Sequence, residues 1–417
     1  MKGLFCLLCL LGWSAVTAWS GGFESGGLGA RATGMGGAFI GVADDWTAVY
    51  WNPGGLARLK GTEISGGVEY VRILAHDSQG LVNAQIPFTQ ANLERGDVFS
   101  QFGGEPSQFN GQDSDFHSPL PSAGFYTQFR GMTIAAGSYT PLGFAFDVTD
   151  PSQPGYNAAY KSDGLLINHN LSIAKTIYPG VSIGAGVNLV QAKLDRTAYK
   201  VTPLYESSIG ADSKALGVQG VFGMMIDLGT QAHVGAVYRT GEDLSLHGHA
   251  YVNDGRFPPE STDFTQTVRD PTTYGVGLSV LPWTTLTLSA DWQRTEWSAW
   301  RQKVQFDQQG LILQNQDINP GWASTNRYRF GAEWRAWKGL SVRAGYFRDP
   351  RAVSFESQAL TGLIDPDAHY VTSGISYRWT RWQIDLSNQY GASTENVDGI
   401  VIRKEVNSFT TQLDYFL

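Results

Sequence analysis

The chain has 417 residues, of which 16% are charged, 12% are aromatic and 50 are glycine. Soluble domains carry roughly 25% charged residues, yet the mean hydropathy of −0.19 is too low for a protein built from membrane helices. The net charge of −8 argues against nucleic acid as a partner, because binding to phosphates needs a basic surface. The composition fits a membrane β-barrel, in which strands alternate between lipid-facing and water-facing residues.

Residues 1–20 have the features of a secretory signal peptide. Lys2 supplies a positive charge, and residues 4–12 are apolar but too short to span a bilayer. The small residues allow cleavage after Ser20, with cleavage after Ala18 as the alternative. Both cysteines lie in this segment, and no apolar run long enough for a transmembrane helix follows it.

Residues 21–60 differ from the rest of the chain. They are rich in Gly and Ala, lack an alternating pattern and end near Asn52-Pro53-Gly54. We expect a compact, partly helical segment here, separate from the strands that follow.

From residue 61 to residue 417 the chain alternates between apolar and polar residues. One example is the set Leu286, Leu288, Ala290 and Trp292, which alternates with Thr287, Ser289 and Asp291. We count fourteen such stretches. A charged face cannot point at lipid cheaply, so it must point into the interior. The sequence predicts an all-β fold, a transmembrane antiparallel barrel of about 14 strands in the outer membrane. A soluble all-β sandwich or propeller is the alternative.

The connections alternate between short turns and longer segments, as in barrels with tight periplasmic turns and long outer loops. Short turns are predicted at Arg130-Gly131, Pro179-Gly180 and Lys338-Gly339. Outer loops are predicted over 75–118, 143–162, 197–213, 250–267, 298–324, 350–368 and 393–402.

The final strand is apolar on one face, with Phe409, Leu413, Tyr415 and Leu417. It resembles the signal read by the barrel-assembly machinery, although that signal usually ends in Phe rather than Leu. We expect this machinery and outer-membrane lipid as partners, and a monomeric barrel.

Three local patterns suggest chemistry but have simpler explanations. Gly180-Val181-Ser182-Ile183-Gly184 matches G-x-S-x-G, yet it opens a strand rather than a strand-to-helix turn. His247 and His249 share one strand face, and two histidines are weak evidence for a metal. Asp44-Asp45 is explained by a helix cap or a solvated turn. We therefore expect no enzyme activity, no metal and no cofactor.

Several motifs appear in order along the chain. They are Gly26–Ala32, Gly41–Asp45, Asn52-Pro53-Gly54, Ala192–Arg196, Tyr238-Arg239-Thr240, Tyr328-Arg329, Leu340–Gly345, Ile364–Asp367 and Ser373-Gly374. This series resembles the FadL/TodX family of outer-membrane transporters of long-chain fatty acids and hydrocarbons. Gly54 stands where that family usually has Ala. The resemblance implies a fourteen-stranded barrel whose lumen is plugged by residues 21–60.

The resemblance also implies roles for individual residues. Phe23, third in the chain after cleavage at Ser20, corresponds to an aromatic that enters the family's ligand pocket; the alternative is a Phe that anchors the plug. Lys193 and Arg196 are candidates to pair with a ligand carboxylate, and a solvated rim charge is the alternative.

The third predicted strand ends at a further candidate site. Thr140, Pro141 and Gly143 correspond to a kinked strand and a lateral opening in the family's barrel wall. Pro141 cannot donate to a ladder and Gly143 favours a bend, and Asn52-Pro53-Gly54 is the candidate plug contact that would satisfy the break. The alternative is that Pro141 simply begins an outer loop.

The 75–118 loop is unusually apolar for an outer loop and includes Phe88, Phe99 and Phe102. Such patches mark binding sites, so these residues are candidates for ligand contact; the alternative is a loop that packs on itself. The predicted function is passive uptake of hydrophobic small molecules. A structural or secretion-associated barrel subunit is the alternative.

Overall fold

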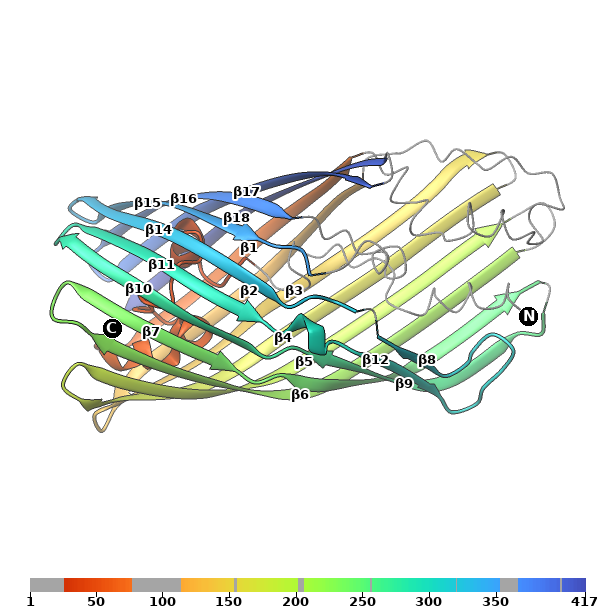
Figure 1. The fold of residues 1–417 in the computed structure, drawn as a ribbon, viewed down its shortest axis with the longest axis horizontal. Coiled ribbons are helices and arrows are strands. Elements are labelled where there is room, and N and C mark those ends of the chain that lie inside the picture. The colour runs from red at the N-terminus through yellow and green to blue at the C-terminus, as the bar shows by residue number, and fades with distance from the viewer. Residues whose placement is uncertain are drawn as a thin grey trace.

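The computed structural model describes residues 26–76, 114–153, 156–201, 206–255, 257–319, 321–352, 367–397 and 400–417. The predicted signal peptide lies outside them. One closed sheet surrounds a short helical segment at one end of its interior (Figure 1). No helix among the described residues is long and apolar enough to cross a membrane.

The sheet has 18 strand segments and closes on itself through β1 and β18. Their bounds are β1 (Glu63–His76), β2 (Ser114–Phe129), β3 (Met132–Gln153), β4 (Tyr156–Tyr178), β5 (Val181–Val201), β6 (Glu206–Asp227), β7 (Ala232–Arg239), β8 (Glu242–Asp254), β9 (Glu260–Asp270), β10 (Thr273–Trp283), β11 (Leu286–Thr295), β12 (Gln302–Phe306), β13 (Gln316–Ile318), β14 (Thr325–Trp337), β15 (Leu340–Asp349), β16 (Ala368–Trp379), β17 (Trp382–Val397) and β18 (Ile400–Phe416).

Some segments are two parts of one barrel strand. β6 pairs with β7 toward one end of the barrel and with β8 toward the other, so β7 and β8 are consecutive parts of the same strand. The pairs β9 and β10, β11 and β12, and β13 and β14 are related in the same way. Counted so, the sheet is a closed antiparallel barrel of 14 strands, which confirms the predicted fold.

The short turns lie where the sequence places them. Arg130 and Gly131 both have positive φ, 50° and 75°, the conformation of a tight hairpin whose twist matches its strands. Gly180 and Gly339 also occupy turns with positive φ. These turns lie at the end of the barrel that holds the helical segment (Figure 1).

Several predicted outer loops are wrong, because strands continue through them. β3 and β4 extend through 143–162, β5 and β6 through most of 197–213, and β8 and β9 through most of 250–267. A strand crosses a bilayer in about 9–11 residues, so the outer halves of these long strands lie beyond the lipid. On β5, the outward residues Gln191 and Lys193 are polar although the strand and its backbone pairing continue.

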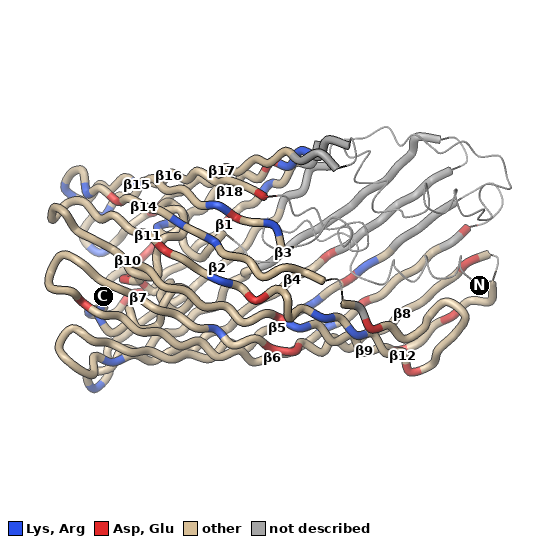
Figure 2. Tube along the Cα trace, viewed as in Figure 1, with Lys and Arg blue, Asp and Glu red and all other residues tan. Residues whose placement is uncertain are grey.

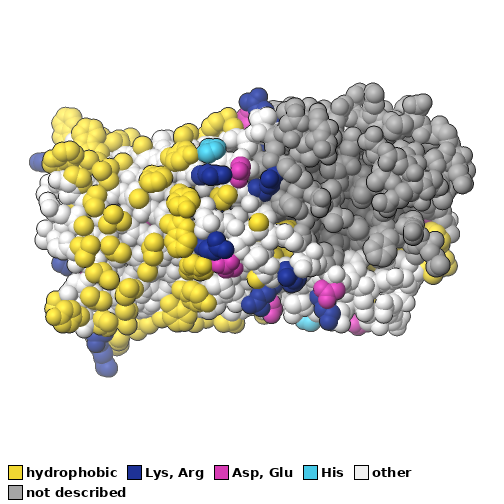
Figure 3. All heavy atoms as spheres, in the orientation of Figure 1, with side chains coloured by type: hydrophobic (Ala, Val, Ile, Leu, Met, Phe, Trp, Pro, Cys, Tyr) yellow, Lys and Arg dark blue, Asp and Glu magenta, His cyan; other side chains and the backbone are white. Residues whose placement is uncertain are grey.

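The outward face of the barrel carries an apolar belt (Figure 3). Large exposed side chains include Leu171, Leu216, Val218 and Val371. Aromatic side chains border the belt on both sides: Phe129, Tyr178, Trp283, Trp334, Trp337 and Trp379 near the short turns, and Tyr238, Tyr328, Tyr346 and Tyr390 on the other side. Two aromatic girdles around an apolar belt are typical of a barrel in a membrane.

Candidate functional site

The helical segment that fills one end of the barrel, here called the plug, spans Gly26–Gly61. It contains α2 (Ala30–Gly34), α3 (Ala48–Trp51) and the 3₁₀ helix η1 (Pro53–Arg58). Its side chains form an apolar core with inward residues of the wall; the buried plug members include Met35, Phe39, Ile40, Trp46, Trp51 and Leu56. The plug is therefore a packed part of the barrel interior.

Glycines on the inward face of the wall allow the plug to approach closely. A Cβ added at any of them would collide with plug atoms; they are Gly124, Gly137, Gly184, Gly223, Gly235, Gly277, Gly331 and Gly345. Two of them, Gly124 and Gly137, face the indole ring of Trp46. Contact between plug and wall thus explains the glycines at these positions.

Asn52 connects the plug to itself and to the wall. Its Nδ2 donates to the carbonyls of Ile40 and Met224, both at 3.0 Å, and its Oδ1 accepts from the amide of Gly54 at 3.0 Å. The side chain is fully buried, so every one of these bonds replaces a bond to water.

We expect Asn52→Ala to destabilise the plug by about 1–3 kcal/mol, because two buried carbonyls lose their donor. Hydrogen exchange of the plug amides in the folded barrel measures this directly. The strand amides of β14 to β18 serve as an internal control, and equal acceleration there would contradict a local role for Asn52.

A chain of charges, buried except at Asp44, fastens α2 to the wall. Arg31 Nε donates to Glu333 Oε2 at 2.8 Å, and its Nη1 pairs with Asp44 at 2.5 Å. Glu333 also accepts from Arg343 Nε at 2.7 Å, and Arg343 Nη1 pairs with Asp385 at 2.6 Å. The network runs from the plug across β14, β15 and β17, so it holds the plug in one position. Charges of both signs lie at this end of the barrel (Figure 2).

The barrel wall is irregular at Thr140 and Pro141. The β3–β4 register shifts between Tyr139 and Leu142, which makes a bulge of these two residues, and Gly143 then pairs with Leu165. On the other side of β3, pairing with β2 runs from Phe129–Met132 to Ser122–Tyr139. Both strands continue, but within their described ranges no further β2–β3 pair follows. The alternative that Pro141 begins an outer loop does not hold, since β3 extends to Gln153.

The plug side chains nearest this irregularity are aromatic. Tyr50 packs edge-on against Tyr139, with ring centroids 5.8 Å apart. The Arg239 guanidinium carbon lies over the Tyr50 ring, 4.2 Å from the ring centroid. The Nη2 of Arg239 also donates to the backbone carbonyl of Tyr50 at 2.6 Å. With Trp46 against Gly124 and Gly137, these residues lie where the β2–β3 ladder ends.

Above the plug, one part of the inward face of the barrel is apolar. Leu194, Leu244, Leu246 and Val268 form a buried cluster with three tryptophans, Trp297, Trp300 and Trp322. The Trp300 and Trp322 rings stack with centroids 4.5 Å apart. Water-filled barrels have polar interiors, so this lining marks a different kind of lumen.

Glu296 holds the segment that carries these tryptophans. It accepts from Arg294 Nε at 2.7 Å, from Ser324 Oγ at 2.7 Å and from the Tyr274 hydroxyl at 2.9 Å. The bonds to Arg294 and Ser324 lower the pKa of Glu296 to about 2, so its carboxylate stays ionised and the contacts persist at neutral pH.

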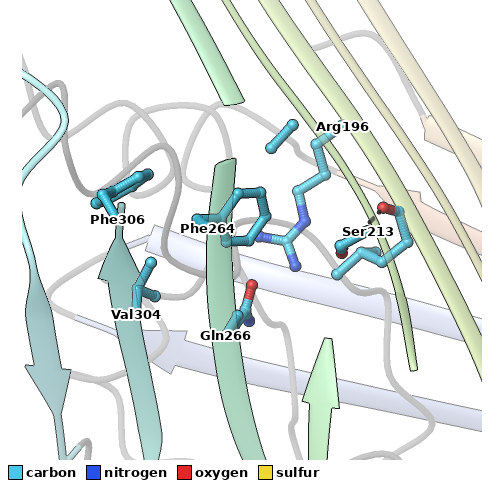
Figure 4. Close-up of a pocket in the computed structure, with 8 residues that line it drawn as sticks. Arg196, Ser213, Phe264, Gln266, Val304 and Phe306 are labelled. Atoms are coloured by element: carbon cyan, nitrogen blue, oxygen red, sulfur yellow. Dashed lines mark hydrogen bonds between the residues drawn. The ribbon is translucent and has the colours of Figure 1, made fainter. Parts of the chain in front are cut away.

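Farther out, an apolar pocket surrounds the head of Arg196 (Figure 4). Leu194, Phe264, Val304 and Phe306 supply most of its walls, and Ser213 and Gln266 add polar atoms. The Gln266 Nε2 is buried and has no hydrogen-bond partner among the described residues. The pocket thus combines apolar walls with two donor groups, the amide of Gln266 and the guanidinium of Arg196.

Comparison with protein families identifies the family of the chain. The family described as outer membrane protein transport protein (OMPP1/FadL/TodX) matches residues 12–399. The chain therefore belongs to the OMPP1/FadL/TodX family. It is thus an outer-membrane transport protein, as the sequence motifs indicated. No curated protein matches it.

Solved structures of FadL/TodX proteins share the fold. A FadL homologue from Pseudomonas aeruginosa is 14% identical, with a TM-score of 0.72 over 97% of this chain and 99% of the other. The toluene transporter TbuX from Ralstonia pickettii is 17% identical, with a TM-score of 0.70 over 95% and 100% of the two chains. The toluene transporter TodX from P. putida is 16% identical, with a TM-score of 0.67 over 94% and 98%.

In this FadL/TodX barrel, Lys193 and Arg196 point to opposite sides of the wall. Arg196 is 7% exposed and faces inward, whereas the Lys193 side chain is 52% exposed and pairs with Asp195 on the outer surface. Residues an odd number apart on a strand face opposite ways. Of the two candidates, only Arg196 faces the lumen, so the prediction of a partner for a ligand carboxylate remains for Arg196 and is corrected for Lys193, as strand parity alone would have indicated.

Asn52, Pro53 and Gly54 also lie elsewhere than expected. They contact Gly184, Gly223 and Met224 on β5 and β6 rather than the bulge in β3. Tyr50 and Trp46 occupy the position near the bulge. Phe23, Phe88, Phe99 and Phe102 lie outside the described residues.

The local patterns set aside in the sequence have ordinary structural roles. Ser182 lies in β5, with its hydroxyl 2.9 Å from that of Thr176, and Gly184 faces the plug. His249 faces outward and bonds Asp263 and Ser261, each at 2.7 Å. The apolar pocket and the tryptophan cluster were missed, because their members are far apart in the sequence.

Proposed function

We propose that this barrel takes up hydrophobic molecules, either long-chain fatty acids or aromatic or aliphatic hydrocarbons. The observation that carries the proposal is the apolar cluster that lines the lumen above a packed plug, beyond the buried polar residues Asn188, Gln219 and Glu242. Apolar solutes cross a polar lumen poorly but partition into such a lining, where burial is worth about 25 cal/mol per Å². The chain acts as a channel rather than as an enzyme.

The outer pocket is the proposed first binding site. Phe264, Phe306 and Val304 would cover an apolar chain or ring, while Arg196 and Gln266 would donate to a carboxylate or another acceptor at its end. Toluene transporters among the similar structures indicate that neutral hydrocarbons are the competing ligand class.

The proposed exit is lateral, past Thr140, Pro141 and Gly143. The bulge and the end of the β2–β3 ladder support a break in the wall at this height. An unpaired edge in hydrocarbon is normally costly, and Tyr50 and Trp46 of the plug lie beside it. An apolar ligand that leaves here enters the lipid without crossing the aqueous periplasm.

The remaining predicted residues keep their proposed roles. Phe23, near the mature amino end, would reach the ligand, and Phe88, Phe99 and Phe102 would contribute to capture at the outer surface. Phe23→Ala is then expected to weaken ligand binding while the barrel still assembles.

The function is tested by extracting and identifying what co-purifies with the barrel, followed by titration with labelled fatty acid and toluene. Binding of the fatty acid, of toluene or of both identifies the class of ligand. Displacement of one by the other would show that the two classes share a site. A barrel that neither retains nor binds any hydrophobic molecule would instead be a structural or secretion-associated subunit.

Arg196 gives a sharper test of ligand class. Arg196→Gln is expected to weaken binding of a fatty acid by about 1.5–3 kcal/mol, because a charge-assisted hydrogen bond is lost, or about tenfold or more in Kd. Binding of toluene is expected to change little.

Lys193→Gln is the matched control, since it removes an equal charge from the outer surface of the same strand. Loss of fatty acid and toluene binding together in Arg196→Gln would indicate damage to the pocket rather than a role in recognising the carboxylate.

A further inference from the structure

Three cations form a cluster on the outer surface of β9 and β12, here called the outer basic cluster. Arg269 lies in β9, and Lys303 lies in β12 directly opposite Thr267. Arg301 precedes β12 and faces Arg269, whose backbone amide donates to the Arg301 carbonyl at 3.1 Å. All three side chains point away from the lumen, because their neighbours Val268, Gln302 and Val304 are buried on the inward face.

The cluster has an excess of positive charge. Arg269 pairs with Asp243 at 3.0 Å, and no other ion pair involves the three cations within the described part of the chain. The outward neighbours Ser245, Thr265, Thr267 and Gln305 are uncharged. Asp317 on β13 is exposed and lies opposite Lys303, so the three cations face two carboxylates, Asp243 and Asp317. Like charges directly opposite on a sheet are destabilising, so an anion bound between them would relieve a real repulsion.

The height of the cluster identifies the kind of anion. On the same barrel strand as Arg269, Val276 and Leu278 are exposed in the apolar belt, and Tyr274 lies between the belt and the cluster. Lys and Arg side chains gather beyond the edge of the hydrophobic area on this face of the molecule (Figure 3). The cluster therefore lies on the outer side of the belt, at the level of the lipid headgroups.

We propose that the outer basic cluster binds the phosphate groups of lipopolysaccharide, the phosphorylated glycolipid of the outer leaflet. Arginine suits this role because its planar guanidinium matches phosphate in a bidentate manner and is weakly hydrated. Arg301 is already oriented, since its Nη1 donates to the carbonyls of Ser298 at 3.1 Å and Trp300 at 2.7 Å. The bound lipid would cover the outer surface of β9 and β12. Its binding would not depend on any ligand inside the barrel.

The test compares two charge-removing variants. R269Q/R301Q/K303Q removes the cluster, and R335Q/K338Q/R381Q removes three exposed cations at the short-turn end of the same barrel. Each purified barrel is incubated with diphosphoryl lipid A, dephosphorylated lipid A or phosphatidylglycerol in detergent micelles, and retained lipid is counted by native mass spectrometry. Heat-modified gel mobility verifies that every variant is a folded barrel.

The wild type and the short-turn variant are expected to retain diphosphoryl lipid A, and the cluster variant about tenfold less. Retention that is equal in the cluster variant and the wild type overturns the proposal. So does equal retention of dephosphorylated lipid A, which would show that acyl chains alone hold the lipid. Equal retention of phosphatidylglycerol would mean a site for any anionic lipid rather than for lipopolysaccharide.

Discussion

Arg31→Ala is expected to loosen the plug and let polar solutes through the barrel. Arg31 joins α2 to Glu333 at 2.8 Å in a nearly buried pair, with side-chain exposures of 15% and 5%. Removing one partner of such a pair leaves an uncompensated buried charge and costs about 3–5 kcal/mol. Arg343 still binds Glu333 but faces Asp385 as well, so it cannot neutralise both carboxylates. Entry of a large polar antibiotic into cells that express the variant, or ion conductance in a planar bilayer, measures the leak.

Arg58→Ala is the matched control for this prediction. Arg58 also links plug to wall, through His233 at 3.1 Å and Asp227 at 3.7 Å, but at a more exposed place. An exposed pair contributes about 0–1 kcal/mol, so this variant should stay tight. Equal leaks in both variants, or none in Arg31→Ala, would show that the buried charges do not hold the plug.

Gly143→Trp is expected to abolish uptake while ligand still binds in the outer pocket. The lateral route requires open space where β3 leaves β2 above Tyr139, and an indole adds roughly 150–250 Å² of surface there. Uptake of labelled ligand into cells, compared with binding to the purified variant, separates the two steps.

Gly66→Trp controls for a bulky residue on the barrel. Gly66 faces outward on β1, and a side chain there meets open space. Normal uptake by Gly143→Trp would exclude the lateral route, whereas equal loss in both variants would indicate a general defect in the barrel.

The strands in the membrane were predictable because lipid imposes its own pattern. Leu288 and Ala290 on β11 face outward, and Thr287, Ser289 and Asp291 face inward, as their alternation required. Where the strands leave the lipid, as on β5 beyond Leu189, nothing constrains the outward side chains to be apolar. On β5 the pattern therefore ends before the strand does, which is why a loop was predicted over 197–213.

The sequence by itself determined the barrel, its strand count, the inward position of Asp291 and the family to which the chain belongs, since each depends on local alternation or on motifs in order. Only the tertiary structure decided which inward residues meet. Arg31 and Glu333 are 302 positions apart, and the outer pocket joins β5, β6, β9 and β12. Closing a sheet into a barrel brings distant strands together across the lumen, and the register that sets those contacts is fixed by the whole ladder of backbone hydrogen bonds rather than by any one segment.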